Sequence, residues 1–583
     1  MIEIKDLSFG FPQKELFNNV SFTIEDGQHA AFIGVSGGGK TTLIEMIMDD
    51  EKFMYDGKIL IDPSCRIGHV SQFYKKPVAD THTVFEYLCE PFITLQTEID
   101  ALCSLMETAE DLEPILEKYQ TALDAFDAIG GHDYETDILK KLNLASLGKL
   151  KDLSIEQISG GEFKLVQVIK EMVSNPHLLI MDEPDVFLDF ENLSALKDLI
   201  NAHKGMLFVV THNRYLLNHC FNKIIHLENM EVQEFEGNFI QYKFELLENK
   251  IEQQELSVKD DEEIARNEAL IGKLRIIATN HSEASRGRAL KARVKVQERL
   301  EARRIKAPFV AIKQPNIKFE MPEIGFDSED PILSVENLNL RFEHDLIKQA
   351  NFEINAGEKV ALIGANGTGK TTLFREIRRN QNDCVKIADD IKIGYLSQSV
   401  HESIDESQTV LDTFYEIGMP TSESIRLHVM HFGFESDVLK QKISALSGGE
   451  KNLMQLAILT AQKNDLLLLD EPTSHLDTYA QMALESAIEG YKGTVLMISH
   501  DYYMIANCMD HVLIIEDHTV RKMSIRKFRK MIYENHFKHS YLELEQKKKA
   551  LETKIETALS QQEFESAKLW ATELEEIINQ MIA

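Results

Sequence analysis

Short apolar runs bounded by glycine, acidic residues and histidine occur in two separate parts of the chain. In the first part these runs are residues 29–33, 178–181 and 209–210, and in the second part they are 360–363, 466–469 and 497–498. Apolar runs of this length, bounded by turn residues, are typical of buried strands. The first run of each part leads into a glycine-rich loop and then into a helical pattern. Each part therefore predicts a strand–loop–helix unit in an α/β domain.

A different pattern fills residues 241–306, where no proline and only two glycines interrupt the sequence. Apolar residues recur there at helical spacing, and a polar break at 278–283 divides them. They are Leu247, Ile251, Val258, Ile271 and Leu274 before the break, and Ala292, Val296 and Leu300 after it. We expect two antiparallel helices, the first of roughly thirty residues and about 45–50 Å. A similar stripe between Tyr541 and Ile582 predicts a short C-terminal helical coiled-coil hairpin.

Both glycine-rich loops match the pattern GxxxxGK[ST], which holds the phosphates of a nucleotide. The first copy spans Gly34–Thr41, and the second spans Gly364–Thr371, 330 positions later. Glycines let the backbone N–H groups of such a loop wrap around phosphate oxygens at the N-terminus of the following helix. Because each copy stands between a strand and a helix, the sequence predicts two nucleotide sites on one chain.

Four further motifs follow each loop in the same order: a glutamine after a strand, a Ser-Gly-Gly-Glu segment, an apolar run ending in Asp-Glu-Pro, and a run ending in histidine. They occur at Gln72, Ser159–Glu162, Asp182–Pro184 and His212, and again at Gln398, Ser447–Glu450, Asp470–Pro472 and His500. The serine, aspartate, glutamate and histidine pairs are all 288 positions apart. A lone acidic strand end or a lone histidine is usually structural, but duplication in register argues against that interpretation.

Between the glutamine and the serine the two parts differ in length, with 87 positions in the first and 49 in the second. The extra 38 positions fall in an acidic helical stretch around residues 98–126. This difference predicts an inserted pair of helices, and an element that docks a partner is the alternative.

Composition predicts a cytoplasmic globular protein. The 583 residues suffice for several domains, and no run approaches the roughly 18 apolar residues needed to cross a bilayer. The sequence begins without a secretion leader, and its six scattered cysteines predict neither a disulfide framework nor a zinc site. The net charge of −32 is unevenly distributed, because residues 271–306 contain 11 Lys/Arg and 3 Glu, a net charge of +8.

In order and type, these motifs resemble those of the ATP-binding cassette superfamily, over nearly all of residues 1–240 and 314–523. The resemblance implies two cassettes that hydrolyse ATP with Mg²⁺. The implied ATP-binding residues are Gly34, Gly37, Gly39, Lys40, Thr41, Thr42, Ser159, Gly160, Gly161, Gly364, Gly367, Gly369, Lys370, Thr371, Thr372, Ser447, Gly448 and Gly449. The implied metal ligands are Thr41, Gln72, Asp182, Thr371, Gln398 and Asp470. The implied catalytic residues are Glu183 and Glu471, which orient the attacking water, with His212 and His500.

In this superfamily each ATP lies between the phosphate loop of one cassette and the Ser-Gly-Gly helix of another. The resemblance therefore implies a monomer whose two cassettes pair with each other. One ATP is expected between Lys40 and Ser447, and the other between Lys370 and Ser159.

An aromatic side chain is also implied beside each adenine. Phe11 and Phe342 stand where the family stacks an aromatic ring on the base. A phenylalanine buried in the core is the alternative interpretation of both positions.

The two copies differ after the glutamate. Glu471 is followed by Pro472 and then Thr473–His475, close to the usual form of the family, whereas Glu183 is followed by Pro184 and then Asp185–Phe187. Asp189 and Asp477 are present in both copies. We therefore expect two usable sites that hydrolyse ATP at different rates.

The whole chain is similar to the ABC-F branch, in which two cassettes are joined by a helical linker without a membrane domain. The similarity implies an ATPase that binds the ribosome, with its linker directed toward the peptidyl-transferase centre. Its implied contacts are rRNA and the P-site tRNA, through Arg286, Arg288, Lys291, Arg293 and Lys295. A solvated hairpin that serves only as a spacer is the alternative. Members include translation factors and proteins that protect the ribosome from antibiotics, and both roles stay open.

Two other functions are compatible with paired cassettes. The nucleotide-binding motor subunit of a membrane ABC transporter would leave the basic hairpin unexplained, and a chromosome or repair ATPase usually needs a longer coiled coil or zinc-binding cysteines. The predicted architecture is α/β. It consists of cassettes at 1–240 and 314–523, a helical linker at 241–313, and a basic segment with a helical hairpin at 524–583.

Overall fold

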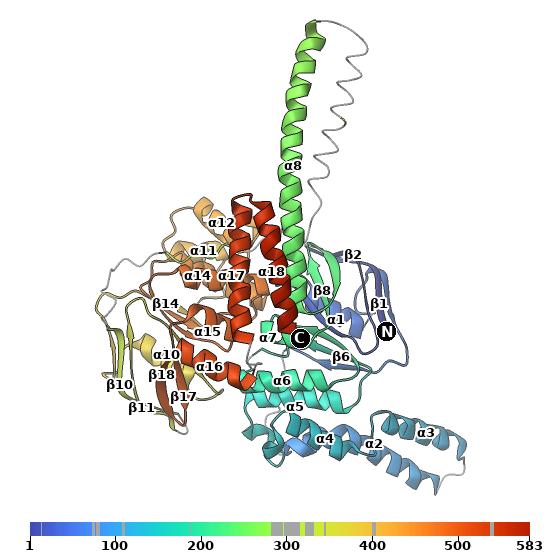
Figure 1. Ribbon diagram of the computed structural model, residues 1–583. Helices are drawn as coiled ribbons and strands as arrows, with labels where there is room; N and C mark the ends of the chain where they lie inside the picture. The colour runs from blue at the N-terminus through green and yellow to red at the C-terminus, as the bar shows by residue number, and fades with distance from the viewer. Residues whose placement is uncertain are drawn as a thin grey trace. The chain divides into compact units, whose positions relative to one another are not determined.

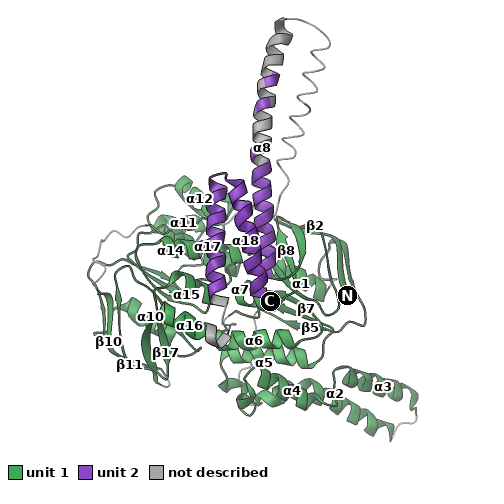
Figure 2. Cartoon of the chain, in the orientation of Figure 1, with its two compact units in different colours: residues 1–238, 313–532 green, residues 239–312, 533–583 purple. Residues whose placement is uncertain are grey.

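The computed structural model describes most of both cassettes and the first helix of the linker. The residues that it does not describe are 13, 50, 73–75, 77–81, 108–110, 187, 281–294, 296–314, 321–330, 343–344, 399–403, 537–540 and 583. The chain forms two compact units, one made of residues 1–238 and 313–532 and the other of 239–312 and 533–583 (Figure 2). In the first unit we refer to residues 1–238 as the first cassette and to 313–532 as the second cassette.

A six-stranded sheet with the strand order β5-β6-β7-β3-β8-β9 forms the centre of the first cassette (Figure 1). Its strands are β3 (His29–Gly34), β5 (Ile67–Val70), β6 (Leu178–Asp182), β7 (Met206–Val210), β8 (Lys223–Glu228) and β9 (Glu231–Glu236). All pairs are parallel except β8 with β9. Every residue of β6 and β7 is buried, as expected for parallel strands with both faces covered.

A smaller antiparallel sheet, β2-β1-β4, shares a core with the central sheet. It consists of β1 (Ile2–Phe11), β2 (Lys14–Ile24) and β4 (Asp56–Ile61). Ile2 and Ile4 of β1 are buried opposite Ile24 and Phe22 of β2 because alternate side chains of a strand point to one face. The helix α1 (Lys40–Met48) packs its apolar side chains against the same core and so fixes the phosphate loop at its N-terminus.

The other helices of the first cassette include the insertion predicted from its extra length. They are α2 (Val84–Met106), α3 (Glu113–Ala128), α4 (Tyr134–Leu144), α5 (Gly160–Val173), α6 (Phe190–Ala202) and α7 (Arg214–His219). Helices α2 and α3 pack against each other, with Ala122 and Phe126 buried. The Tyr134 ring stacks on Phe92 of α2, with ring centroids 4.4 Å apart. The predicted pair of inserted helices is therefore confirmed.

The second cassette repeats the same architecture. Its sheets have the orders β14-β15-β16-β12-β17-β18 and β11-β10-β13. The strands are β10 (Pro331–Arg341), β11 (Asp345–Asn355), β12 (Lys359–Gly364), β13 (Val385–Ile387), β14 (Ile393–Leu396), β15 (Leu466–Asp470), β16 (Thr494–Ile498), β17 (His511–Glu516) and β18 (Thr519–Ser524). The helices are α10 (Lys370–Arg379), α11 (Val410–Glu416), α12 (Ser422–His431), α13 (Gly448–Thr460), α14 (Thr478–Gly490), α15 (Tyr502–Cys508) and α16 (Ile525–His536).

The second unit is a helical assembly of distant segments. It contains α8 (Phe239–Asn280), α17 (Tyr541–Ser560) and α18 (Phe564–Ile582), which lie side by side in Figure 1. Ile240 and Ile251 of α8 form one buried cluster with Ile555 of α17 and Ile578 of α18. Lys568 Nζ lies 2.6 Å from Glu255 Oε2 at the exposed edge of this cluster. The predicted C-terminal helical hairpin thus packs against the base of the linker helix.

The linker helix α8 is longer than predicted. Its 42 residues correspond to about 63 Å at 1.5 Å per residue, against the expected 45–50 Å. Helix α8 continues through the start of the polar break, because residues 278–280 contain neither glycine nor proline. The predicted basic residues Arg286, Arg288, Lys291 and Arg293 lie outside the described residues, and Lys295 is exposed. Within the described part of the chain, no helix is long and apolar enough to cross a membrane.

Candidate functional site

Each phosphate loop is a tight turn between a strand and a helix. Gly39 and Gly369 are the N-caps of α1 and α10, with φ of 98° and 96°. This left-handed region is costly for any residue with a Cβ, which explains glycine at both positions. Of the other predicted loop glycines, Gly34 and Gly364 end strands β3 and β12, and Gly37 and Gly367 lie between the strand and the N-cap. Thr42 and Thr372 are partly buried in the first turn of the helix.

The two loop lysines lie against their own loops. Lys40 Nζ donates to two loop carbonyl oxygens at 2.9 and 3.0 Å, and Lys370 Nζ makes the same pair of bonds at 2.8 and 3.0 Å. Burial lowers the pKa of both lysines, and the carboxylates of Glu183 and Glu471 oppose that effect. Both sites therefore place an ammonium group at the mouth of the loop, where nucleotide phosphates would lie.

The end of one buried strand in each cassette presents oxygen ligands beside the loop. Thr41 Oγ1 donates to Asp182 Oδ2 at 2.9 Å. Burial raises the pKa of Asp182 to about 6, and burial with the adjacent Glu471 carboxylate raises the pKa of Asp470 to about 7. Threonine hydroxyls and carboxylates are hard oxygen donors, and a bound divalent cation would favour the ionised carboxylates. Together with the amides of Gln72 and Gln398, these residues fit Mg²⁺.

The first phosphate loop contacts two segments of the second cassette. Ser36 Oγ donates to the His475 backbone oxygen at 3.1 Å, and Ser36 N lies 3.4 Å from Asp477 Oδ2. A Cβ on Gly449 would be 2.6 Å from Ser36 Oγ, so only glycine fits at this point of the Ser-Gly-Gly segment. Ser447 is the N-cap of α13 and forms a reciprocal capping box with Glu450. The N-terminus of α13 is thereby placed at the first phosphate loop.

The second phosphate loop makes the reciprocal contacts with the first cassette. Asn366 N donates to Asp189 Oδ2 at 3.1 Å, and a Cβ on Gly161 would lie 3.3 Å from Asn366 Nδ2. Ser159 caps α5 through the same kind of box with Glu162. A cavity of about 700 Å³ lined by Gly160, Gly161, Lys370, Glu471 and His500 lies at this contact. This volume is within the usual range of ligand sites, about 300–1,000 Å³.

Glu183 is held by groups from both cassettes. Its Oε2 accepts a hydrogen bond from Gln72 Nε2 at 2.6 Å and another from His475 Nδ1 at 3.1 Å. Burial alone would raise the pKa of Glu183, but the His475 hydrogen bond and the nearby His212 and Lys40 outweigh burial and lower the pKa to about 2. The Glu183 backbone has a φ of 45°, a strained conformation for a non-glycine residue that is common at functional sites.

Glu471, the equivalent carboxylate of the second cassette, has different surroundings. Its backbone has a φ of 50°, and its Oε1 lies 3.4 Å from His500 Nε2. Burial raises the pKa of Glu471 to about 7, although Lys370 and a backbone hydrogen bond from His500 oppose the change. The residue in register with His475 is Phe187, which lies outside the described residues. In the sequence, the histidine at 475 thus corresponds to a phenylalanine at 187.

Of the two predicted catalytic histidines, His212 is buried and His500 is mostly buried, with 15% of its side chain exposed. Burial lowers the pKa of His212 to about 3, with an added contribution from the charge of Lys40. Burial and the charge of Lys370 likewise lower the pKa of His500 to about 3. Neutral imidazoles can donate one hydrogen bond and accept another, which suits a contact to both a phosphate oxygen and a water molecule.

The predicted adenine-stacking rings are accessible. Phe342 is 80% exposed and lines the same cavity as Lys370, and Phe11 is 48% exposed. The Phe11 ring lies edge-on to Phe9, with centroids 5.2 Å apart. The alternative that these phenylalanines are buried core residues is therefore wrong.

Sequence reasoning did not select three further residues. Two of them, His475 and Arg214, make contacts between the cassettes, and Asp185 accepts a hydrogen bond from Thr211 Oγ1 at 2.6 Å. The replacement of Thr473–His475 by Asp185–Phe187 in the first copy was the available signal for His475 and Asp185. Arg214 had no comparable signal, because its partners are more than 270 positions away.

Comparison with known proteins agrees with the predicted superfamily. A family model described as ABC transporter matches residues 17–186 and 347–474. ABC transporter F family member 2 of Arabidopsis thaliana is 28% identical over 536 residues, which cover 88% of this chain and 76% of that protein. The energy-dependent translational throttle protein EttA of Haemophilus influenzae is 26% identical over 517 residues, which cover 86% of this chain and 89% of that protein.

A solved structure shares the fold of this chain. The archaeal ribosome recycling factor aABCE1, determined in complex with the ribosomal stalk protein aP1, superimposes with a TM-score of 0.52. The match covers 91% of this chain and 92% of that chain at 17% sequence identity. At this identity the likeness shows a common fold, and the predicted α/β fold with two cassettes is confirmed.

Proposed function

We propose that this chain, which belongs to the ATP-binding cassette family, is a member of the F branch of that family and acts as a ribosome-associated ATPase whose cassettes close around two ATP molecules. Cassettes of this family hydrolyse ATP, so the protein is an ATP hydrolase. The observation that carries the proposal is the contact of each phosphate loop with the Ser-Gly-Gly segment of the opposite cassette. Because both halves of each site lie on one chain, a monomer can complete two sites.

In the proposed reaction, equivalent residues of the two sites have the same roles. The loop lysine and the positive end of the helix dipole at the N-terminus of α5 or α13 bind the negative charge of the γ-phosphate. Glu183 or Glu471 orients and polarises the attacking water, and neutral His212 or His500 contacts the γ-phosphate and that water. Mg²⁺, when bound by the threonine, aspartate and glutamine of a site, neutralises the charge on the β- and γ-phosphates. Loss of the γ-phosphate removes the group shared by the two cassettes, so hydrolysis opens them.

The ribosome is proposed as the partner on two grounds. Residues 271–306 have a net charge of +8 in a chain of net −32, and a dense basic segment is the usual means of neutralising nucleic-acid phosphates. One relative, whose alignment covers 86% of this chain and 89% of its own length, is named a translational throttle protein. We further propose that five basic residues of this segment contact rRNA and the P-site tRNA, namely Arg286, Arg288, Lys291, Arg293 and Lys295. The proposed domains are cassettes at 1–240 and 314–523, a linker at 241–313 and a C-terminal segment at 524–583. A translation factor and an antibiotic-protection protein both fit this function.

Charge reversal tests the proposed partner. We expect Arg286, Arg288, Lys291 and Arg293 changed to Glu together to weaken co-sedimentation with ribosomes and to leave ATPase activity without ribosomes unchanged. Binding by the native chain should fall on the order of 10³-fold between 50 and 200 mM salt if about six phosphates are neutralised. The matched control reverses Lys140, Lys149, Lys151 and Lys204, which are exposed on the first cassette. Equal losses in the two charge-reversed proteins, or sedimentation with membrane vesicles in place of ribosomes, would contradict the proposal.

A further inference from the structure

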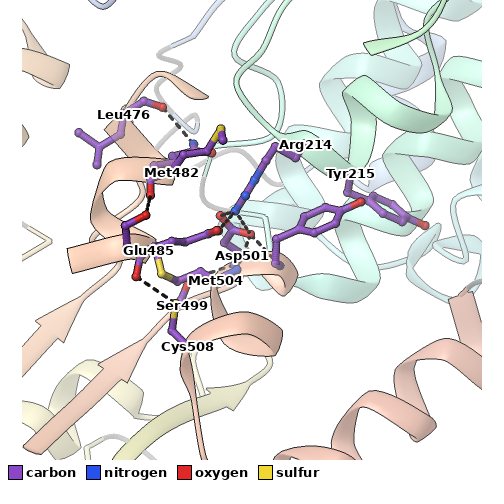
Figure 3. Close-up of polar contacts among 12 residues, drawn as sticks. Arg214, Tyr215, Leu476, Met482, Glu485, Ser499, Asp501, Met504 and Cys508 are labelled. Atoms are coloured by element: carbon purple, nitrogen blue, oxygen red, sulfur yellow. Dashed lines mark hydrogen bonds and ion pairs between the residues drawn. The ribbon is translucent and has the colours of Figure 1, made fainter. Parts of the chain in front are cut away.

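One cation of the first cassette is enclosed by acidic groups of the second. Arg214 is the first residue of α7, two positions after His212, and only 12% of its side chain is exposed. Its Nη2 donates to Glu485 Oε1 and to Asp501 Oδ2, the latter at 3.0 Å (Figure 3). The guanidinium also lies over the Tyr503 ring, with Cζ 4.9 Å from the ring centroid. Burial disfavours the charged form of Arg214, but the two carboxylates outweigh burial and raise its pKa.

Each of these carboxylates belongs to an element that carries site residues. Asp501 follows His500 directly and caps α15, accepting hydrogen bonds from Tyr503 N at 2.9 Å and Met504 N at 3.2 Å. Glu485 lies on α14, whose N-cap Asp477 contacts the first phosphate loop. Arg214 therefore holds the backbone that positions His500, the histidine next to Glu471. A shift of this backbone would move the His500 imidazole relative to Glu471 Oε1, now 3.4 Å away.

The ion pairs of Arg214 with Glu485 and Asp501 have no counterpart among the residues at the equivalent positions of the opposite cassettes. The positions equivalent to Arg214, Asp501 and Glu485, shifted by 288, are Tyr502, Asn213 and Lys197. A reciprocal bridge would need a cation at 502 and acids at 213 and 197, and the chain has a ring, an amide and a lysine there. Tyr502 instead contacts the Phe190 ring, with centroids 5.9 Å apart. Among the residues in register, only the set with Arg214 on the first cassette and Glu485 and Asp501 on the second can form this ion pair.

We propose that Arg214 of the first cassette is a positioning residue of the second ATP site, which fixes the His500–Asp501 segment when the cassettes close. This inference rests on the proposed hydrolytic roles of Glu471 and His500. A buried carboxylate pair left without its cation would rearrange to reach solvent, because unpaired buried charge is costly. Loss of Arg214 should therefore disturb chemistry at the second site, while the first site retains its Glu183–His475 hydrogen bond.

Single-turnover ATP hydrolysis can separate the two sites. Each test variant is made in a parent protein in which one site is inactivated. In the Glu183→Gln parent only the second site hydrolyses ATP rapidly, and in the Glu471→Gln parent only the first site does. We expect Arg214→Met to slow the phosphate burst about tenfold or more in the Glu183→Gln parent, since small misplacements of a catalytic group cost large factors in rate. In the Glu471→Gln parent the burst should change less than about twofold, and half-saturation by ATP should be unchanged in both.

Two further variants and one control complete the test. Arg214→Lys keeps the charge and should restore part of the burst rate, and Glu485→Gln leaves the Asp501 contact and should slow the second site more mildly. These two variants decide the question if Arg214→Met does not fold. Arg426→Met is the matched control, because Arg426 pairs with Glu423 within one helix of the second cassette. The inference would be overturned if Arg214→Met slowed both sites equally or slowed neither site. If neither glutamine parent lowers phosphate yield, the assignment of Glu183 and Glu471 fails instead.

Discussion

His475 of the second cassette donates a hydrogen bond to Glu183 of the first, with Nδ1 3.1 Å from Oε2. The two residues are 292 positions apart, and both side chains are mostly buried, at 18% and 15% exposed. Glu183 thus receives a donor that becomes available only when the cassettes meet. The carboxylate that we propose to orient water is therefore sensitive to cassette closure in the first site, through a residue whose register partner is Phe187.

Removing this donor should slow the first site. We expect His475→Ala to lower the single-turnover rate in the Glu471→Gln parent by about tenfold, because Glu183 loses a bond that fixes its orientation. His475→Asn should retain much of the rate, since its amide can donate from a similar position. The same two substitutions should leave the Glu183→Gln parent nearly unchanged. An alanine variant as fast as its parent would show that the hydrogen bond has no role in orienting Glu183.

The two sites should contribute unequally to steady-state turnover. Glu183 accepts hydrogen bonds from Gln72 and His475, and the sequence position in register with His475 is Phe187, a residue type whose side chain has no hydrogen-bond donor. We therefore expect Glu183→Gln to reduce total ATPase activity more than Glu471→Gln, measured with and without ribosomes. Residual activities that are indistinguishable under both conditions would refute the asymmetry.

Each loop lysine should be required for one bound nucleotide. Lys40 and Lys370 are buried inside separate loops and contact only their own loop carbonyls among the hydrogen bonds described. We expect Lys40→Ala or Lys370→Ala to reduce the stoichiometry of Mg·ATP from two per chain to one, measured by equilibrium dialysis in the Glu183→Gln/Glu471→Gln background. Two bound ATP in either lysine variant at saturation would disprove the assignment of the loops.

The C-terminal hairpin should stabilise the base of the linker helix. Ile555 is completely buried in the cluster that includes Ile240 and Ile251 of α8. Ile555→Ala should lower the free energy of unfolding of this unit by about 2–5 kcal/mol, the usual cost of such a cavity. Hydrogen exchange of residues 240–251 should rise accordingly. Leu569→Ala is the control, because Leu569 is 62% exposed, and exchange that rises equally in both variants would contradict the predicted support.

Residues fixed by local geometry could be predicted from the sequence. The phosphate loops, the aspartates at the ends of β6 and β15 and the capped Ser-Gly-Gly helices each follow from a short motif with one structural solution. The length of α8 was underestimated, because a few polar residues without glycine or proline do not end a helix.

Contacts between distant segments were less accessible to sequence reasoning. The pairs Glu183–His475 and Arg214–Asp501 depend on the register in which two cassettes meet, which no local pattern encodes. The resemblance to the superfamily implied that the cassettes pair, but a pairing alone does not show which side chains touch. The hydrophobic stripe of α8 similarly predicted a buried face without indicating that α17 and α18 cover it.

The most direct test of the central claim is ATP-dependent binding of a variant that cannot hydrolyse ATP. Glu183→Gln/Glu471→Gln keeps the size and hydrogen bonding of both side chains but removes the carboxylates that polarise water. We expect this double variant to remain closed with Mg·ATP, to co-sediment with ribosomes and to block translation in a cell-free system. Without ATP, or with Lys40→Ala and Lys370→Ala added, it should remain in the supernatant. Sedimentation with ribosomes that does not depend on ATP, or no sedimentation under any of these conditions, would contradict the account.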